Sequence, residues 1–361
     1  MHAQRRCSIN LHTHLNTGAG IKMTTEHPTE ANLLPRRVSR TEFGKKSGMN
    51  GSMDDWTQTL RRVVLVANRK GGVCKSSLCR SVASVLESGG YSVLVVDGDP
   101  QGNVSEIDFG LETDRGRSLA MAMQYGTDLS PESVRGIDVI CGGPELQGAL
   151  GAAGIPGSGV SLDANLRGAL GRLCEDRKYD MVLIDSGPGD TMLLDAYMMA
   201  ARWLIVPTIS DEASFAGVDK MGARYAEAVS QRGAEIEFLG AVLTKVDHQA
   251  TARNKAIRQE LAEALGSAGE PFEAMIRYNA ANAIDSRRHA LSAQEVAAEG
   301  VTQRKSRLAE LRHRARGSRS GAPEVQDTWW SRSSGSALSA DYEVLTREIL
   351  TRIGQKEAVN A

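Results

Sequence analysis

The stretch that decides the fold is Val63-Val64-Leu65-Val66-Ala67-Asn68-Arg69-Lys70-Gly71-Gly72-Val73-Cys74-Lys75-Ser76-Ser77. The apolar run at its start predicts a buried strand, and the glycine pair that follows predicts a loop whose backbone can approach a ligand closely. Residues 77–88 are then compatible with a helix. This order of strand, glycine-containing loop and helix is the context in which a loop binds phosphate groups.

The residues of this loop have separable chemical roles. Gly71 and Gly72 let the backbone approach phosphate oxygens, Lys75 offers a positive charge, and Ser76 offers a hydroxyl to Mg²⁺. A bare glycine pair would more simply be a connecting turn, but the strand before it and the helix after it favour phosphate binding. We expect the nucleotide phosphates to be bound by Gly71, Gly72, Val73, Cys74, Lys75, Ser76 and Ser77.

The composition of the whole chain is that of a globular protein. Its 361 residues suffice for one large or two ordinary domains, and 43 basic against 44 acidic residues exclude a globally basic nucleic-acid coat. The five cysteines show no CxxC or Cys/His ligand spacing, so a reducing cytoplasm fits better than a disulfide framework. No apolar run approaches the roughly twenty residues of a spanning helix, and we expect neither secretion nor stable membrane insertion.

Apolar strands alternate with helix-length intervals beyond the loop. The predicted strands that follow residues 63–67 are 92–97, 137–140, 181–185, 204–208, 239–244 and 272–276. Near-continuous Val, Leu and Ile in the strands that begin near residues 92 and 181 suits burial on both faces. The alternation predicts an α/β fold, a doubly wound and mostly parallel sheet flanked by helices, with ligands at the carboxyl ends of the strands.

The pattern divides the chain into four segments. Residues 1–58 lack periodicity and are predicted to be a disordered arm, although methionines at 23, 49 and 53 also allow a later start. Residues 59–299 form the phosphate-binding domain, and 300–338 are a basic, Ser/Gly-rich insertion. Residues 339–361 contain an amphipathic helix that we expect to pack back on the domain.

Two motifs resemble those of a known family. Lys70-Gly71-Gly72-Val73-Cys74-Lys75-Ser76 resembles the deviant Walker A loop of the ParA/MinD ATPases, and residues 97–103, DGDPQGN, are similar to the DxDPQGN segment of the ParA branch. The resemblance covers roughly residues 61–285 and the terminal helix 341–353. It implies a cytoplasmic, nucleoid-associated P-loop ATPase that uses ATP and Mg²⁺, forms a nucleotide-sandwich homodimer, binds duplex DNA without sequence preference, and segregates plasmids or chromosomes with a ParB-like partner.

The resemblance assigns roles to the two lysines and to the serine. Lys75 is the lysine on the β- and γ-phosphates, and Ser76 is the direct Mg²⁺ ligand. Lys70 is the signature lysine, which in the family reaches the nucleotide of the other subunit. Two lysines are electrostatically sensible, because triphosphate and Mg²⁺ together still carry negative charge.

The carboxylates that follow two apolar strands complete the predicted site. Asp99 matches the catalytic aspartate that orients the attacking water, and Asp97 is placed to help order the metal shell. Asp185 resembles the Walker B aspartate, which contacts Mg²⁺ through water, although a turn cap is the alternative. Pro207 occupies the position of the family's proline beside the nucleotide base.

The sequence departs from the family at two positions and is ambiguous at a third. Cys74 stands where the family has glycine, so a side chain at this close approach predicts a clash with phosphate or a strained backbone. Its thiol, beside Lys75 and a helix N-terminus, is expected to favour the thiolate, unless it is simply buried. Gly187 replaces a family proline, which is expected to loosen that loop. Asp247 in Thr244–Asp247 could read a guanine, whereas DPQGN favours adenine.

Basic residues in the second half of the chain are the candidates for contacts with DNA. The six candidates are Arg253, Lys255, Arg258, Arg277, Arg287 and Arg288. Their alternative is a solvated helix face. Residues 287–319 contain nine lysines and arginines against three glutamates, a net charge of about +6 that could bind DNA without folding.

Three functions follow from these observations. The first is an ATP-dependent switch for DNA partition. The second is a related ATPase that positions a protein or membrane cargo, although the mixed charge of the terminal helix is unlike a membrane-binding helix. The third is a nucleotide-binding module in which Cys74 impairs hydrolysis.

Overall fold

The computed structural model describes residues 56–155, 157–302, 312 and 335–359. The predicted arm up to residue 55, and the predicted insertion at residues 303–311 and 313–334, lie outside the described residues. The described chain begins with Trp56, which packs against the core over Gly171, where a Cβ would lie 2.1 Å from the indole. Residues 56–58 therefore belong to the folded domain rather than to the arm.

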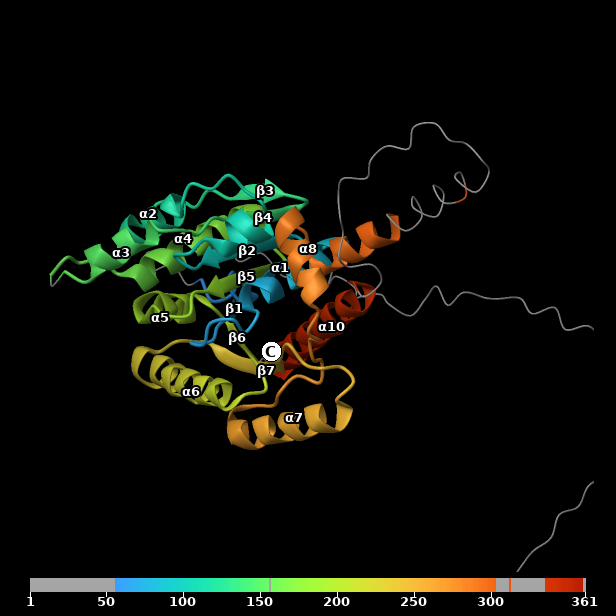
Figure 1. Ribbon diagram of the computed structural model, residues 1–361. Coiled ribbons are helices and arrows are strands. Elements are labelled where there is room, and N and C mark those ends of the chain that lie inside the picture. The colour runs from blue at the N-terminus through green and yellow to red at the C-terminus, as the bar shows by residue number, and fades with distance from the viewer. Residues whose placement is uncertain (1–55, 156, 303–311, 313–334, 360–361) are drawn as a thin grey trace, which may run out of the picture. The chain divides into compact units, whose positions relative to one another are not determined.

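Seven strands form one sheet in the order β3-β4-β2-β5-β1-β6-β7 (Figure 1). Their bounds are β1 Val63–Val66, β2 Val93–Gly98, β3 Glu132–Val134, β4 Ile137–Ile140, β5 Met181–Ser186, β6 Trp203–Thr208 and β7 Glu237–Leu243. All neighbouring strands are parallel except β3, which is antiparallel to β4 at the edge. The predicted doubly wound, mostly parallel sheet is confirmed.

The apolar run of β1 is buried on both faces because the sheet is covered on both sides. Val64 and Val66 belong to one buried cluster, whereas Val63 and Leu65 belong to the other, as the two-residue period of a strand requires. Helices α1 (Lys75–Ser88) and α10 (Gly335–Val359) cover the face of the sheet that carries the first cluster. The second is covered chiefly by α2 (Arg117–Tyr125), α3 (Leu146–Ala153), α4 (Leu162–Arg177), α5 (Thr191–Ala200) and α6 (Glu212–Arg232).

The remaining elements lie along the second half of the chain and after β2. They are a short π-helix, Val104–Asp108, and the helices α7 (Thr251–Leu265) and α8 (Ala280–His289), with a 3₁₀ turn at Gly266–Ala268. Residues 293–302 are also helical. Because every strand next to β1 is parallel to it, the loops that follow β1, β2, β5 and β6 meet at one edge of the sheet.

The predicted strand 272–276 is not a regular strand. The segment is extended and lies beside β7, where Phe272 N donates to Ala241 O at 2.7 Å and Ile276 N donates to Leu243 O at 2.9 Å. Between these two points it departs from β7, so a continuous ladder does not form. The alternation of apolar residues in the sequence does not reveal this departure, because burial of the side chains is preserved.

Side chains of α10 complete the hydrogen bonding of this extended segment. The carboxylate of Glu348 accepts from Glu273 N at 3.0 Å and from Ala274 N at 2.9 Å. One turn later the guanidinium of Arg352 donates to Pro271 O at 2.8 Å. The predicted terminal helix therefore packs on the domain and also satisfies backbone groups that the sheet leaves without strand partners.

Candidate nucleotide site

The loop between β1 and α1 is tied at its start to the end of β6. Asn68 is buried, and its Nδ2 donates to Pro207 O at 2.8 Å while its Oδ1 accepts from Lys70 N at 2.9 Å. Its amide thus joins the loop to the strand that carries the predicted base-side proline. Sequence reasoning missed Asn68, and its place between an apolar strand and two cations was the available signal.

Cys74 adopts the left-handed backbone that its position demands. Its φ of 65° and ψ of 29° lie in a region that L-residues seldom occupy, and it immediately precedes the first residue of α1. The backbone conformation agrees with the expectation of strain at a glycine position. Of the two alternatives for its thiol, the buried one is favoured, because burial raises the pKa of Cys74 and the nearby Lys245 cation offsets only part of that effect.

Lys75 and Ser76 begin α1 and face the buried carboxylate of Asp185. Ser76 Oγ donates to Asp185 Oδ2 at 2.7 Å, and Lys75 Nζ donates back to Lys70 O at 3.3 Å. Burial lowers the pKa of the Lys75 ammonium, while the carboxylates of Asp185 and Asp99 oppose that shift. The fold thus brings Lys75 and Ser76 to Asp185, which lies more than a hundred positions further along the chain.

Two of the predicted carboxylates are neighbours on adjacent strands. Asp97 of β2 and Asp185 of β5 are partners in register, and neither is exposed. Burial first, and then the Asp97 carboxylate, raise the pKa of Asp185 well above its usual value. A cation at this point would relieve the cost of burying two like charges side by side.

The carboxylate of Asp97 organises the loop that follows β2. Its Oδ2 accepts from Ser105 N at 2.9 Å and from Ser105 Oγ at 2.7 Å, and its Oδ1 accepts from Asp99 N at 3.2 Å. Burial raises the pKa of Asp97 to about 6, although these hydrogen bonds stabilise the anion. These contacts favour a role in positioning Asp99, and the assignment of Asp97 to the metal shell stays a prediction.

Asp99 directly follows β2 at the same edge of the sheet and lies against the loop after β5. It is 8% exposed, and its Oδ1 accepts from Gln101 N at 2.9 Å. A Cβ at Gly187 would lie 3.0 Å from that oxygen, so the glycine permits close approach of the two loops. A proline at 187 would crowd Asp99, which gives this departure from the family a packing consequence.

The oxygen donors at this edge fit a divalent cation shared with phosphate. Mg²⁺ prefers oxygen ligands and usually keeps several waters beside one or two protein groups and substrate phosphates. The Ser76 hydroxyl and the Asp185 carboxylate supply such groups. In the described part of the chain, no three His, Cys, Asp or Glu side chains gather into a site that would hold a metal by protein groups alone.

Lys70 projects from the tip of the loop to a residue on the other side of the site. Its Nζ lies 2.5 and 2.6 Å from the two carboxylate oxygens of Asp211, in the connection between β6 and α6. This ion pair was not predicted from the sequence. Asp211 lies 141 residues from Lys70 along the chain, so only the fold reveals it.

The loop after β7 contacts the phosphate loop through Thr244 rather than Asp247. Thr244 Oγ1 donates to Val73 O at 3.2 Å. Asp247 is exposed, accepts from Gln249 N at 3.1 Å, and lies 3.7 Å from Arg253. These contacts make Asp247 a cap for the turn that leads into α7, and none of them favours reading of a guanine.

Two of the six predicted DNA contacts are partly buried and hold other segments of the protein. Arg277 pairs bidentately with Asp341 of α10, with Nε–Oδ2 and NH2–Oδ1 distances of 2.6 and 2.7 Å. Arg258 donates to Phe272 O at 3.1 Å and pairs with Glu273. Both side chains therefore anchor the segment beside β7, and their roles in DNA binding stay predictions.

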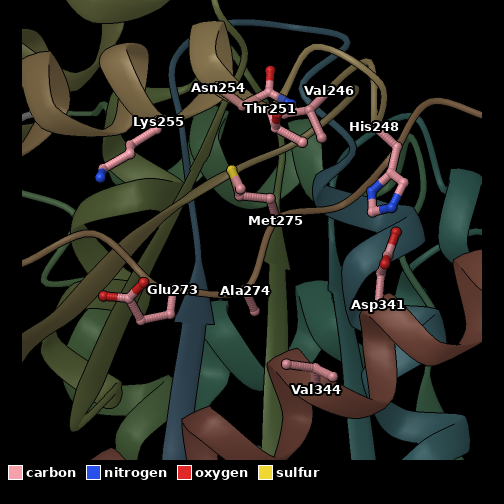
Figure 2. Close-up of a pocket in the computed structure, with 10 residues that line it drawn as sticks. All are labelled: Val246, His248, Thr251, Asn254, Lys255, Glu273, Ala274, Met275, Asp341 and Val344. Carbon is pink, nitrogen blue, oxygen red and sulfur yellow. The ribbon is translucent and has the colours of Figure 1, made fainter. Parts of the chain in front are cut away.

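The other four candidates are exposed. Arg253 and Lys255 lie on α7, and Arg287 and Arg288 lie in the last turn of α8. Lys255 also lines a cavity of about 290 Å³ between α7, the segment beside β7 and the start of α10, which Figure 2 shows. No phosphate-loop residue lines that cavity. Within the described residues, no helix has both the length and the apolar character needed to span a bilayer.

Comparison with known proteins identifies relatives of similar architecture. Residues 61–237 match a family model described as an AAA domain. The chain is 30% identical to protein IncC of Escherichia coli over 239 residues, which is 64% of this chain but only 61% of IncC, less than two thirds. It is 31% identical over 190 residues, 52% of this chain and 70% of the relative, to the chromosome-partitioning ATPase Soj of Thermus thermophilus.

Solved structures share the fold at lower identity. Cyanothece apo McdA superimposes with a TM-score of 0.52 at 20% identity, covering 64% of this chain and 92% of McdA. The pNOB8 ParA structure superimposes with a TM-score of 0.51 at 21% identity, covering 82% of this chain and 99% of that ParA. The likeness to pNOB8 ParA extends the agreement in architecture beyond the segment that matches in sequence.

Proposed function

This chain belongs to the ParA/MinD-type ATPases, and from that premise we propose that it is an ATP-dependent dimerising switch for DNA partition. The ATP-bound dimer binds duplex DNA without sequence preference and associates with the nucleoid in the cytoplasm. Slow hydrolysis, stimulated by DNA and a ParB-like partner, then resets the switch. The name of the Soj relative, a chromosome-partitioning ATPase, supports partition as the process, and the residues of the site support the chemistry.

The observation that carries the proposal is the contact between Ser76 and Asp185 beneath a glycine loop. Their 2.7 Å hydrogen bond joins the start of α1 to the end of β5, and Lys75 and Asp99 are close enough to interact with the Asp185 carboxylate. Backbone N–H groups at the helix start and a lysine together favour a polyphosphate. The buried carboxylate adds the oxygen that a phosphate-bound Mg²⁺ needs.

The residues divide the work of phosphoryl transfer among themselves. Lys75 offsets charge on the β- and γ-phosphates, and Ser76 with Asp185 would hold Mg²⁺. Bound Mg²⁺ would supply neutralisation of the charge that develops on the phosphate oxygens. Asp99, whose N donates to the Asp97 carboxylate that Ser105 fixes in place, orients the attacking water by accepting its hydrogen bond.

Assembly in the presence of different nucleotides tests the proposal. Full-length protein is measured by light scattering on a sizing column with ATP·Mg²⁺, ADP or no nucleotide, each with and without duplex DNA. We expect the protein to dimerise with ATP·Mg²⁺ and to stay monomeric with ADP or without nucleotide. Only the dimer should be retained on DNA. Lys75→Ala should lose ATP binding in calorimetry and remain monomeric. ATP binding by this variant at parental affinity would contradict the assignment of the site.

One observation favours a second candidate, a nucleotide-binding module with impaired hydrolysis. Cys74 holds a strained left-handed backbone at the closest approach of the loop to phosphate. Such strain can permit binding while misplacing the γ-phosphate. Turnover of the ATP-bound dimer at saturating DNA separates the two functions, because the module would form the dimer and release no phosphate.

A further inference from the structure

The ammonium of Lys70 is bound by its own subunit. Its Nζ reaches both carboxylate oxygens of Asp211 at 2.5 and 2.6 Å, and the Lys70 and Asp211 side chains are 25% and 48% exposed. A bidentate contact of this kind occupies two of the three donors of a lysine ammonium. The same group is the one that the proposed function requires to reach a second subunit.

A second, buried contact holds together the two loops that carry this pair. Asn68 joins Lys70 N to Pro207 O, and Pro207 lies four residues before Asp211. Helix α6 packs closely against it, since a Cβ at Gly217 would lie 3.0 Å from Asn68 Oδ1. The backbone at Lys70 is thus restrained at a buried point, and release of Asp211 needs rotation of an exposed side chain rather than movement of the loop.

We propose that Asp211 is a positioning residue that holds Lys70 over its own subunit and competes with the nucleotide of the partner. The inference rests on the proposed function, since Lys70 must leave this pair to cross a dimer interface. A carboxylate that stayed on the ammonium would also bring a negative charge toward the triphosphate. Each dimer breaks two such pairs, so Asp211 raises the protein concentration at which ATP produces the dimer.

Removing the carboxylate should therefore favour the dimer. A partly exposed pair contributes modestly, and removal of two of them should lower the midpoint concentration for dimerisation about 5-fold. Asp211→Asn keeps the shape and removes the charge, whereas Asp211→Glu should restore the parental midpoint. Asp219→Asn removes an exposed charge further along α6 and serves as the matched control.

The first measurement is light scattering of full-length protein with ATP·Mg²⁺ over a range of concentrations. Asp211→Asn should dimerise at a lower concentration than the parent, whereas Asp219→Asn should dimerise at the parental concentration. All three monomers should bind ADP with equal affinity. An unchanged or higher midpoint for Asp211→Asn overturns the proposal. An equal fall in Asp219→Asn also overturns it, because the effect would then be one of net charge.

A second measurement separates this inference from the proposed function. Acetylation of Lys70 by a small reagent, followed by mass spectrometry of nucleotide-free protein, needs no dimer. Asp211→Asn should label Lys70 about twofold faster than the parent, while Asp211→Glu should not. Equal labelling overturns the contact with Asp211 even if ATP produces a dimer. Faster labelling supports it even if the parent forms no dimer, a result that would contradict only the proposed function.

Discussion

Cys74 shows how one side chain can change the energetics of a phosphate loop. Its backbone is left-handed, as a glycine would adopt without cost, and burial raises the pKa of its thiol. A left-handed backbone costs an L-residue about 1–2 kcal/mol. This cost is present before any nucleotide binds, so it lowers the stability of the folded loop as well as affecting nucleotide binding.

Replacement of Cys74 by glycine should relieve that strain. We expect Cys74→Gly to raise the free energy of unfolding by about 1 kcal/mol or less, since the greater freedom of glycine in the unfolded chain offsets part of the relief. ATP affinity or turnover should rise with it. Cys74→Ala keeps the Cβ and removes the thiol, so it should show no gain. Calorimetry and urea unfolding check both variants, and equal values for Cys74→Gly and the parent would show that the side chain is accommodated.

At the scale of elements, α10 holds the extended segment beside β7 in place. It accepts backbone hydrogen bonds from the segment beside β7 through Glu348 and holds Arg277 through Asp341. Tyr342, one residue on, is buried on the same side of the sheet as α1. The helix therefore links the segment that holds Arg277 to the face that carries the phosphate loop.

The pair between Arg277 and Asp341 should contribute to stability. Asp341→Ala leaves the guanidinium and Arg277 N without their acceptor, and we expect a decrease of about 1–2 kcal/mol in the free energy of unfolding because both side chains are partly exposed. Arg277→Ala should add little in that background, since both changes remove one interaction. Urea unfolding of the two single variants and the double variant measures the coupling. Additive decreases would show that the pair is not the source.

The π-helix after β2 carries a carboxylate that should make stability depend on pH. Burial raises the pKa of Asp108 to about 6, although Arg287 and Arg80 lie near it. A folded pKa above the unfolded value means that the folded state binds the extra proton between about pH 4 and 6. Stability from this group is therefore greatest below about pH 4 and disappears as the pH rises to about 6.

Asp108→Asn should remove this dependence. Relative to the variant, the parent should lose about 2 kcal/mol of unfolding free energy between about pH 4 and 6, with no further change above about pH 7. Glu112→Gln, at an exposed position just beyond the π-helix, should leave the parental pH profile unchanged. The free energy of unfolding in urea is measured across this pH range. Parallel profiles for the parent and Asp108→Asn would show that the pKa of Asp108 is not raised by folding.

At the scale of the whole molecule, the basic residues divide into those that hold the fold and those that face solvent. Arg277 and Arg258 are bound to α10 and to the segment beside β7, whereas Arg287 and Arg288 end α8 in exposed positions. Reversing the charge of Arg277 would therefore confuse stability with DNA binding. The pair on α8 is exposed, so its reversal tests DNA binding, and urea unfolding of the same variant measures any cost of reversing Arg287 near Asp108.

DNA binding by the ATP-bound dimer should weaken when that exposed pair is reversed. Arg287→Glu with Arg288→Glu should lower affinity in an ATP-dependent shift assay and reduce the slope of log affinity against log salt by about 1 for each phosphate that the protein no longer neutralises. Arg117→Glu, an exposed arginine on α2, is the control. Parental affinity and slope in the double variant would remove α8 from the interface. Absence of an ATP-dependent shift in the parent at low salt would favour the cargo-positioning alternative.

Local pattern was sufficient for the six parallel strands of the sheet and for the residue types in the loops that follow them. The apolar runs 63–67 and 181–185 matched buried strands because a strand covered on both faces requires continuous apolar residues. The short edge strand β3 was missed, since two of its three residues are exposed and carry no such pattern. The segment 272–276 was assigned as a strand because its alternation records burial, whereas its hydrogen bonds depend on Glu348 of a distant helix.

The sequence by itself determined the order of strand, loop and helix, the identities of Lys75, Ser76 and the aspartates, and the parallel topology that brings them to one edge. These follow from short-range spacing and from the burial that each strand requires. Only the tertiary structure decided that Asp97 orders its own loop, that Arg277 belongs to α10, and that Lys70 rests on Asp211. Such pairings depend on which exposed or half-buried charges the folded chain brings within hydrogen-bonding distance. The spacing of these residues along the sequence does not indicate that they will meet.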